Sequence, residues 1–523
     1  MRDIRLLDCT LRDGGYANDN NFGRDNILKI LDGLNKSGVD LIEYGYIEDQ
    51  KPISRDRVEY RKFEDLDEIV KSKSNRMLML LGEKYEMKNL PVAPYDCILR
   101  VSFHKKNAEA GLQKIEEVIR KGYRVFIQPT ATMFYSDKEL EELLNKCNQL
   151  KPESVAIVDT FGQMKPEDVE EKAKIFDRVL DEGIAISFHA HNNLQNAYAN
   201  AIKFIKSTSD KRPIILDSSI YGMGRGAGNL PTELIMNYLN DKYDKKYNVA
   251  PLLSVVDDVI MKIKDQHDWG YSLPYYLSGV YGVHPSYILT FMERKTLNSS
   301  DILNLIGMIS NEKRSEFDLD YAMGLYDSYN NRHVDDGESK RKLAKSIGER
   351  TVLLVGPGKS LQEYKSKIAA YIEDVSPYII SINGCYDIKP NAVFFSNKKR
   401  YENAKDVAEG CELLITSNIS TNRNDSTVFN YGTYLAREGG VSDNALLIVL
   451  NILRTIGVKK VDLAGFDGYE MERNFYKEAL ELLLNEEYVD KLNKGIIVNL
   501  NALKKDIKIE SLTPSKYFGK ETK

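Results

Sequence analysis

The sequence predicts an α/β protein, with a (β/α)8 TIM barrel followed by a helical annex and a second, Rossmann-like α/β domain. Three observations predict this order. Eight apolar, β-rich runs alternate with helical segments between residues 4 and 216, which is the size and rhythm of a barrel. Polar residues follow the ends of several of these runs. A new series of strands begins near residue 351, and 523 residues are too many for one ordinary domain.

The barrel strands are expected where runs of β-branched and apolar residues alternate with segments of helical period. The expected strands are 4–7, 39–46, 77–81, 97–103, 124–129, 155–158, 184–188 and 214–216. The expected helices include 26–37, 63–73, 107–121, 137–149 and 165–182. An open doubly wound sheet would show the same alternation. It gives no reason, however, for polar residues at the ends of the first, second, sixth, seventh and eighth strands to surround one centre.

The clearest chemical signal joins the ends of the first and seventh strands. Asp13 follows the first strand within a turn rich in glycine, where a tight turn with a surface ion pair is the simplest interpretation of the motif alone. His189 and His191 are two of only six histidines and lie two residues apart after an apolar strand, so both rings point to the same side. Two imidazoles and a carboxylate form an open site for a divalent ion. The sequence therefore predicts a metal centre of Asp13, His189 and His191.

Three motifs together resemble the DRE-TIM metallolyase superfamily. They are Thr10-Leu11-Arg12-Asp13-Gly14, His189-x-His191-Asn192 and the glycine-rich run from Gly222 to Asn229. The superfamily includes 4-hydroxy-2-oxovalerate aldolase, 3-hydroxy-3-methylglutaryl-CoA lyase and the isopropylmalate and citramalate synthases. The resemblance implies that residues 1–295 form a metal-dependent barrel acting on a small 2-oxo acid and an aldehyde. It also implies a divalent cofactor, Mn²⁺ first, with Mg²⁺, Co²⁺ or Zn²⁺ as alternatives.

The resemblance also implies roles for individual residues. Arg12 would stabilise an enolate and contact the substrate together with Glu43 and Asn229, and Thr160 would bind the carboxylate of a pyruvyl group. The segment ending at Tyr281 resembles the part of the hydroxy-oxovalerate aldolases that returns a tyrosine to the active site, where it would shape the aldehyde pocket.

Taken alone, Glu43 has an ordinary rim charge as its alternative interpretation. For Arg100, a charge at the barrel rim is the simpler interpretation.

One position departs from the aldolase pattern. The aldolases carry a histidine base three residues beyond the motif's aspartate, and this chain has Tyr16 there. An unperturbed tyrosine titrates near pH ~10, so Tyr16 would act as a base only if the metal and Arg12 lowered its pKa. A hydroxide at the metal, or a different aldehyde partner, is the alternative.

The sequence therefore favours a metal-dependent aldolase that cleaves or forms a 4-hydroxy-2-oxo acid through a chelated pyruvate enolate. A Claisen-type acyl-CoA synthase or lyase is the second hypothesis. It fits less well, because the synthases usually carry Gly-Glu-Gln where this chain has Gly14-Gly15-Tyr16. The third hypothesis is a nucleotide-sugar-binding biosynthetic protein with a modified barrel, against which the intact Arg12, Asp13, His189 and His191 argue.

Residues 296–348 are predicted to form a helical annex and linker, and residues 349–523 a Rossmann-like domain. The latter opens with an apolar strand and the turn Gly356-Pro357-Gly358. With Asn383-Gly384 and Gly465-Phe466-Asp467, it resembles a Rossmann-like family that includes bacterial sialyltransferases and 6-hydroxymethylpterin pyrophosphokinase-like proteins. The resemblance implies a nucleotide or nucleotide-sugar ligand. No histidine follows His333, so the histidine base of those transferases is absent. A structural or docking role is the alternative.

Composition excludes several classes of partner. Lys plus Arg is 73 and Asp plus Glu is 78, giving a net charge of −5, which does not suggest nucleic-acid binding. No apolar run approaches the length of a membrane helix, and the N-terminus leads directly into a strand, so we expect neither a membrane segment nor a signal peptide. Five scattered cysteines fit a reducing cytoplasm. The sequence leaves the oligomeric state open, a homo-oligomer included.

Overall fold

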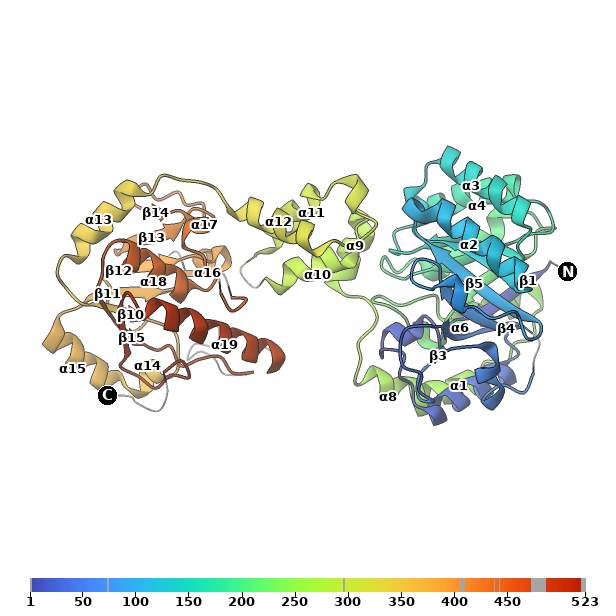
Figure 1. The fold of residues 1–523 in the computed structure, drawn as a ribbon, viewed down its shortest axis with the longest axis horizontal. Helices are drawn as coiled ribbons and strands as arrows, with labels where there is room; N and C mark the ends of the chain where they lie inside the picture. Colours follow the sequence, from blue (N-terminus) through green and yellow to red (C-terminus); the bar gives the residue numbers. More distant parts are fainter. Residues whose placement is uncertain are drawn as a thin grey trace. The chain divides into compact units, whose positions relative to one another are not determined.

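A computed structural model describes residues 2–72, 75–294, 297–404, 410–436, 438–441, 443–471 and 486–518. The chain divides into two compact units, drawn in Figure 1. The first comprises Met1–Ile288 and Ser310–Phe317, and the second comprises Leu289–Ile309 and Asp318–Lys523. The predicted boundary between residues 295 and 296 lies outside the described residues, and the predicted boundary at 348 stays a prediction.

The first unit is a closed barrel of eight parallel strands. They are β1 (Ile4–Asp8), β2 (Leu41–Ile47), β4 (Arg76–Leu81), β5 (Cys97–Phe103), β6 (Arg124–Pro129), β7 (Ser154–Asp159), β8 (Ala185–Ala190) and β9 (Ile214–Ser218). Each strand pairs with the next, and β1 closes the barrel by pairing with both β9 and β2. A two-residue strand, β3 (Glu59–Tyr60), pairs with β2. The predicted barrel is confirmed.

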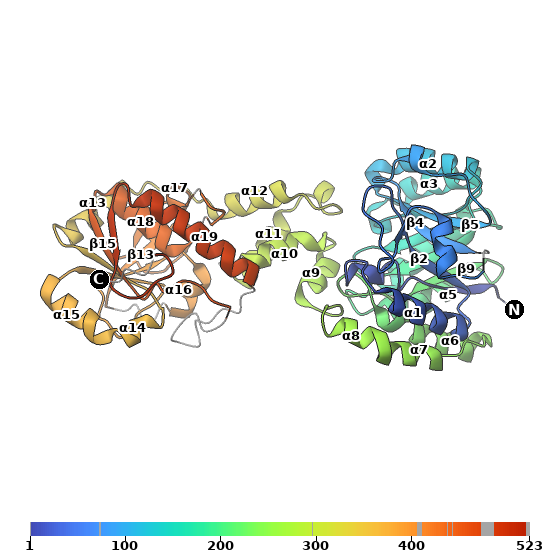
Figure 2. The ribbon, with the colours of Figure 1, turned by 60° about the horizontal axis from the view of Figure 1, so that its bottom comes forward.

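Helices cover the outside of the barrel, as Figures 1 and 2 show. They are α1 (Arg24–Ser37), α2 (Ala108–Arg120), α3 (Asp137–Leu150), α4 (Pro166–Val179), α5 (Ala197–Ser207) and α6 (Thr232–Tyr243). The helix predicted over residues 63–73 is instead a 3-10 helix at Phe63–Glu68, with residue 73 outside the described part. The start of α3 shows how the sequence fixes an end, because Ser136 and Glu139 form a reciprocal capping box.

The barrel interior changes from apolar to charged along the strands. An apolar layer includes Leu41, Ile98 and Ile215, and Cys9 packs in this layer. Alternate residues of a strand face the same side. Two positions further along the same three strands lie the buried side chains of Glu43, Arg100 and Asp217. The period of two thus carries each of these strands from the hydrophobic layer to a charged layer two residues nearer its carboxyl end.

Further helices complete the first unit. They are α7 (Ala250–Val255), α8 (Met261–Lys264) and α9 (Leu273–Tyr281), with a π-helical turn at Val256–Ile260 between the first two. Helix α9 lies against the loop after β8: Asn193 Nδ2 donates to the Tyr275 carbonyl at 3.0 Å, and a Cβ on Gly279 would lie 3.0 Å from Leu194. This helix therefore borders the carboxyl end of the barrel, where barrel enzymes place their active sites.

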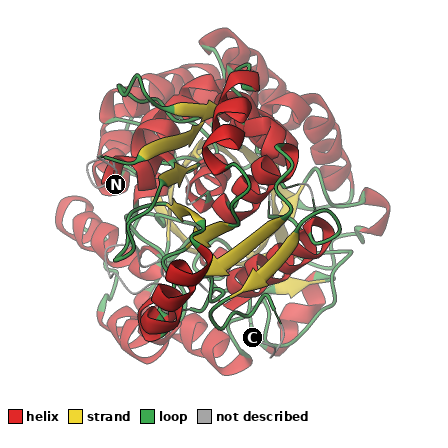
Figure 3. Cartoon of the chain, turned by 90° about the vertical axis from the view of Figure 1, so that its left-hand side faces the viewer, coloured by secondary structure: helices red, strands yellow, loops and turns green. Residues whose placement is uncertain are grey.

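The second unit is built on a seven-stranded parallel sheet with the order β14-β13-β12-β11-β10-β15-β16. Its strands are β10 (Val352–Val355), β11 (Tyr378–Ile382), β12 (Ala392–Phe395), β13 (Glu412–Thr416), β14 (Thr427–Phe429), β15 (Lys460–Ala464) and β16 (Lys508–Ser511). In Figure 3 the strands are yellow and the helices red. The predicted second α/β domain is confirmed as a parallel-sheet fold.

The helices of the second unit begin within the range predicted to form a helical annex, and the extent of that annex stays a prediction. They are α11 (Ser299–Met308), α12 (Leu319–Asn330), α13 (Gly337–Ile347), α14 (Ser360–Glu363), α15 (Lys365–Val375), α16 (Lys398–Ala404), α17 (Tyr431–Tyr434), α18 (Ala445–Thr455) and α19 (Glu486–Leu503), while α10 (Pro285–Glu293) contains the boundary between the units. Within the described residues, no helix is both long and apolar enough to cross a membrane.

Candidate metal centre

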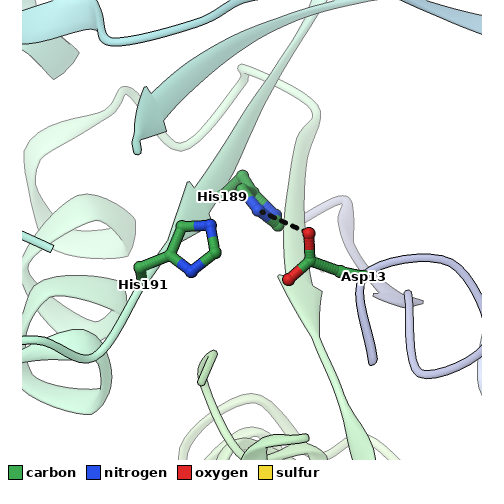
Figure 4. Close-up of side chains that lie close together, drawn as sticks. All are labelled: Asp13, His189 and His191. Atoms are coloured by element: carbon green, nitrogen blue, oxygen red, sulfur yellow. Dashed lines mark ion pairs between the residues drawn. The ribbon is translucent and has the colours of Figure 1, made fainter. Parts of the chain in front are cut away.

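Asp13, His189 and His191 meet at the carboxyl end of the barrel (Figure 4). Asp13 lies in the turn after β1, His189 is on β8, and His191 directly follows that strand. One ligand atom from each residue lies within 4.8 Å of the other two, and His189 Nε2 is 3.9 Å from Asp13 Oδ1. The three residues predicted as metal ligands are therefore brought together.

Asp217, on β9, fixes the orientation of His189. Its Oδ2 lies 3.0 Å from His189 Nδ1 and accepts a hydrogen bond from that nitrogen. The lone pair of Nε2 is then directed toward Asp13. A carboxylate behind a ligating histidine is the usual arrangement in metal sites, because it fixes the tautomer and raises the basicity of the ring.

A series of buried ion pairs connects Asp13 to Asp217. Arg12 Nη1 donates to Asp13 Oδ1 at 2.5 Å, and its Nε donates to Glu43 Oε2 at 2.8 Å. Arg100 Nη1 donates to the same Glu43 oxygen at 2.9 Å and Nη2 donates to Asp217 Oδ2. The interpretation of Arg100 as a rim charge is wrong: its side chain is fully buried, because residue 100 faces the barrel interior two positions beyond Ile98.

Burial and the neighbouring charges determine which side chains of the site are ionised. Burial alone would raise the pKa of Asp13, but Arg12 and the two histidines outweigh it and hold the pKa well below its usual range. Burial would also raise the pKa of Asp217, and there Arg100 and His189 lower it. Burial lowers the pKa of His191 to about 4. An ionised carboxylate and a neutral imidazole are the forms that bind a metal ion.

Asn229 is a further polar residue beside Asp13. An isolated β-bridge joins Asn229 to His191, and Asn229 Nδ2 donates to Asp13 Oδ2 at 2.6 Å. Its Oδ1 is buried and has no hydrogen-bond partner among the described residues. A buried carbonyl oxygen without a partner is costly unless a ligand satisfies it. The oxygen and nitrogen donors present therefore fit a divalent ion with open positions.

The remaining predicted residues lie around this centre at different depths. Tyr16 is 49% exposed, and its ring meets that of Tyr46 edge to face at 6.2 Å. Thr160 follows β7, and its Oγ1 accepts a hydrogen bond from the Ala131 amide at 2.7 Å. Tyr281 ends α9 with its side chain 37% exposed. Among the described residues, no interaction joins Thr160 or Tyr281 directly to the Asp-His-His group.

Three further residues at this end of the barrel escaped the sequence analysis. Asp217 directly follows the apolar run 214–216 and could have been found as the polar end of the last strand. Arg225 lies inside the glycine-rich run, where Asn229 was the residue given a role. His284 lies three residues beyond the segment that ends at Tyr281, and its Nε2 is 3.3 Å from Arg225 Nη2.

Comparison with known proteins places the barrel in a family. A family model described as HMGL-like matches residues 98–259. The 4-hydroxy-2-oxovalerate aldolase of Moorella thermoacetica is 28% identical over 338 residues, covering 62% of this chain and 97% of that protein. The 4-hydroxy-2-oxovalerate aldolase 2 of Salinispora arenicola is 30% identical over 241 residues, covering 44% and 67%. The oxaloacetate decarboxylase of Mycobacterium tuberculosis is 26% identical over 242 residues, covering 45% and 69%.

The fold and site define a TIM-barrel lyase with a buried Asp-His-His group. The chain belongs to the HMGL-like family of the DRE-TIM metallolyases, whose lyases use a divalent metal ion. The predicted resemblance of the barrel is confirmed. The resemblance of the second unit to sialyltransferases and pyrophosphokinase-like proteins stays a prediction.

Proposed function

We propose that the barrel is a divalent-metal-dependent aldolase that cleaves or forms a 4-hydroxy-2-oxo acid. The observation that carries this proposal is the buried group of Asp13, His189 and His191, with Asn229 Oδ1 left without a partner beside it among the described residues. The named aldolase relatives support the same reaction. A Claisen-type acyl-CoA reaction remains the alternative outcome of the test.

Asp13, His189 and His191 would hold the ion. Mn²⁺ is the first candidate because of the resemblance to the metallolyases, and the Asp13 carboxylate is a ligand type that suits it. When bound, the ion supplies Lewis-acid stabilisation of negative charge on the oxygen atoms of a 2-oxo acid. The barrel supplies the rigid ligand geometry, since each ligand lies on a strand or on the turn that directly follows one.

Arg12 would stabilise the enolate. Its Nε and Nη1 donate to Glu43 and Asp13, and Nη2 forms no hydrogen bond with the described residues, so it is free to donate to the developing oxyanion. Glu43 holds the guanidinium in place. Because Arg12 is fixed before the substrate binds, its charge costs no reorganisation when the enolate forms.

Cleavage requires a base for the 4-hydroxyl group. The hydroxyl proton leaves to the base, the bond between C3 and C4 breaks, C4 becomes the aldehyde carbon, and C3 of the enolate takes up a proton to give pyruvate. We assign the base position to Tyr16, which occupies the place of the histidine in the related aldolases. Thr160 would bind the pyruvyl carboxylate, and Tyr281 would border the aldehyde.

Pyruvate release tests this function. The full chain is incubated with 4-hydroxy-2-oxopentanoate and longer homologues, with Mn²⁺ or with EDTA, and pyruvate is quantified by a coupled dehydrogenase. We expect release that needs the metal and that His191→Ala abolishes without loss of the native circular dichroism. Lys36→Gln, an exposed change on α1, serves as the matched control. Release from an acyl-CoA substrate and none from the oxo acids would favour the Claisen alternative.

A second proposal concerns the second unit, where we infer a site for a nucleotide or nucleotide-sugar. In the sheet order, β10 lies between β11 and β15, so the strand order reverses its direction at β10. Ligands of open parallel sheets bind outside the carboxyl ends of the strands at the point where the strand order reverses. The loops after β10 and β15 are joined there, since Gly358 N donates to the Gly465 carbonyl at 2.8 Å. Asp467 accepts a hydrogen bond from the Ser360 amide, at the start of α14, at 2.9 Å. A ligand would lie beside these two hydrogen-bonded loops.

Unpartnered polar atoms favour a position at the ends of β11 and β12. Asn383 Oδ1 and Ser396 Oγ are buried and have no hydrogen-bond partner among the described residues. Calorimetric titration of the full chain with CMP, UDP and a UDP-sugar tests the site. We expect binding that Ser396→Ala weakens and Ser209→Ala, an exposed serine of the barrel, does not. No heat at millimolar ligand would contradict the proposal and leave the structural or docking role.

A further inference from the structure

Arg225 directly follows a glycine that lies against the Asp-His-His group. It is an exposed residue of the glycine-rich loop after β9. The preceding residue, Gly224, lies against the metal ligands, because a Cβ there would be 3.0 Å from Asp13 Oδ2. The Arg225 guanidinium carbon lies 5.9 Å from the centre of the Tyr16 ring. Arg225 is therefore the next residue in sequence after one that lies against the proposed metal ligands. Its guanidinium lies beside Tyr16, the proposed base.

The charge of Arg225 is not neutralised by the protein. Among the described residues, no carboxylate forms an ion pair with it, whereas Arg12 and Arg100 each contact two carboxylates. Its polar neighbour is His284, with Nε2 at 3.3 Å from Nη2. Burial, and then the charge of Arg225, lower the pKa of His284 to about 3, so this ring is neutral at physiological pH.

The charges of the centre balance without Arg225. Asp13, Glu43 and Asp217 carry three negative charges, and Arg12 and Arg100 carry two positive charges. A divalent ion changes the sum from minus one to plus one, and the carboxylate of a 2-oxo acid returns it to zero. The guanidinium of Arg225 is then a surplus positive charge on the side of Tyr16, where the aldehyde half of the substrate must lie.

We propose that Arg225 binds an anionic group, a carboxylate or a phosphate, on the aldehyde half of the substrate. This inference rests on the proposed aldolase function, and it makes the specificity differ from that for a neutral aldehyde such as acetaldehyde. A guanidinium offers two parallel N–H donors to either anion. Tyr16 and His284 flank the guanidinium without cancelling its charge, so an anion can reach it.

The first test compares pairs of aldehydes in which one member carries an anionic group and the other a neutral group at the same position. Succinic semialdehyde is paired with butanal, and glyceraldehyde 3-phosphate with glyceraldehyde, each added to pyruvate with Mn²⁺. Because a charge-assisted hydrogen bond contributes about ten- to a hundredfold in affinity, we expect kcat/KM to favour the anionic member of at least one pair by that factor. The preferred pair identifies carboxylate or phosphate. Arg225→Gln should bring the ratio of kcat/KM for the anionic and the neutral aldehyde close to one, and Lys36→Gln should leave this ratio unchanged. Equal values for charged and neutral aldehydes would overturn the proposal.

A second test separates failure of this inference from failure of the aldolase proposal. Exchange of the pyruvate methyl protons in D2O, followed by NMR with Mn²⁺, needs no aldehyde and tests the enolate chemistry alone. Binding of succinate and of glycerol 3-phosphate to the EDTA-treated full chain, measured by calorimetry, tests Arg225 alone. We expect Arg225→Gln to weaken binding of one of these anions at least about tenfold. Equal affinity of wild type and variant for both anions overturns the inference, whatever the exchange experiment gives.

Discussion

Asp217 Oδ2 lies 3.0 Å from His189 Nδ1 and also accepts a hydrogen bond from Arg100. One carboxylate oxygen thus connects a histidine of the Asp-His-His group to an arginine whose side chain is completely buried. Through Glu43 and Arg12 the same chain of charges reaches Asp13. The orientation of His189 and the ionisation of Asp13 consequently depend on one connected set of buried groups.

Replacing Asp217 by asparagine should weaken metal binding. The amide oxygen can still accept one hydrogen bond, but the negative charge that orients and polarises His189 is lost. We expect the affinity for Mn²⁺, measured by calorimetry, to fall about ten- to a hundredfold while the far-ultraviolet circular dichroism is unchanged. Asp210→Asn is the control, because Asp210 is 94% exposed and pairs with Arg2. Unchanged affinity in Asp217→Asn would refute the orienting role.

Replacing Arg100 by methionine should destabilise the barrel. The change leaves Glu43 and Asp217 buried with one positive partner fewer, and breaking a buried ion pair costs about 3–5 kcal/mol. Urea unfolding followed by tryptophan fluorescence measures this cost for the first unit, because the only tryptophan, Trp269, is buried there. Lys36→Met, which breaks an exposed pair with Asp32, should shift the midpoint little. A methionine variant as stable as the wild type would contradict this energetic role.

The fold and the grouping of Asp13, His189 and His191 could be predicted from the sequence, because both follow from local patterns. The period-two runs located the strands, and the turn at Asp13 and the His189-x-His191 spacing located the candidate ligands. Arg100 was interpreted as a rim charge and Asp217 was not assigned, because a lone charge within or after an apolar strand does not show which way its side chain faces. These two residues are 117 positions apart, and only the closure of the barrel brings them into contact.

The outer part of the site was less predictable still. Arg225 and His284 lie 59 positions apart, on a glycine-rich loop and on the segment after α9. Neither segment has a hydrophobic period that fixes the direction of its side chains. Their meeting depends on the path of two irregular loops, which no local pattern in the sequence encodes.

A methyl group at Gly224 should disturb the metal centre by steric conflict. A Cβ there would lie 3.0 Å from both Asp13 Oδ2 and Asn229 Cγ and would collide with Asn229 Nδ2. We expect Gly224→Ala to displace Asn229 and to lower the affinity for Mn²⁺ about tenfold or more. Gly183→Ala is the matched control, because nothing lies within 4 Å of the added methyl group. Equal affinities in the two variants would show that Asn229 has no part in the site.

Removing the phenol of Tyr16 should separate binding from proton transfer. Tyr16→Phe keeps the ring that meets Tyr46 at 6.2 Å and removes only the hydroxyl. If the hydroxyl transfers the proton, kcat for aldol cleavage falls about a hundredfold or more with unchanged affinity for Mn²⁺. Tyr16→His, which restores the residue of the related aldolases, should recover part of the rate. An unchanged kcat in Tyr16→Phe would make Tyr16 a wall of the pocket.

Asp159, at the end of β7, should make the metal-free protein less stable as the pH rises. Burial raises the pKa of its carboxyl group to about 7, although the amides of Gln163 and Met164 both donate to it. The unfolded chain has an ordinary pKa near ~3.9, so the folded state binds the extra proton between these values and the free energy of unfolding falls with pH. The predicted loss between pH 5 and pH 8 is about 3 kcal/mol.

The measurement is urea unfolding of the EDTA-treated protein at several pH values, followed by the fluorescence of Trp269. Asp159→Asn cannot titrate, so the difference in stability between wild type and variant isolates this carboxyl group from all others. We expect that difference to shift by the predicted amount in favour of the variant as the pH rises, and to level off above the folded pKa. A difference that stays constant from pH 5 to pH 8 would mean that Asp159 is ionised throughout, with its two amide hydrogen bonds outweighing the cost of burial.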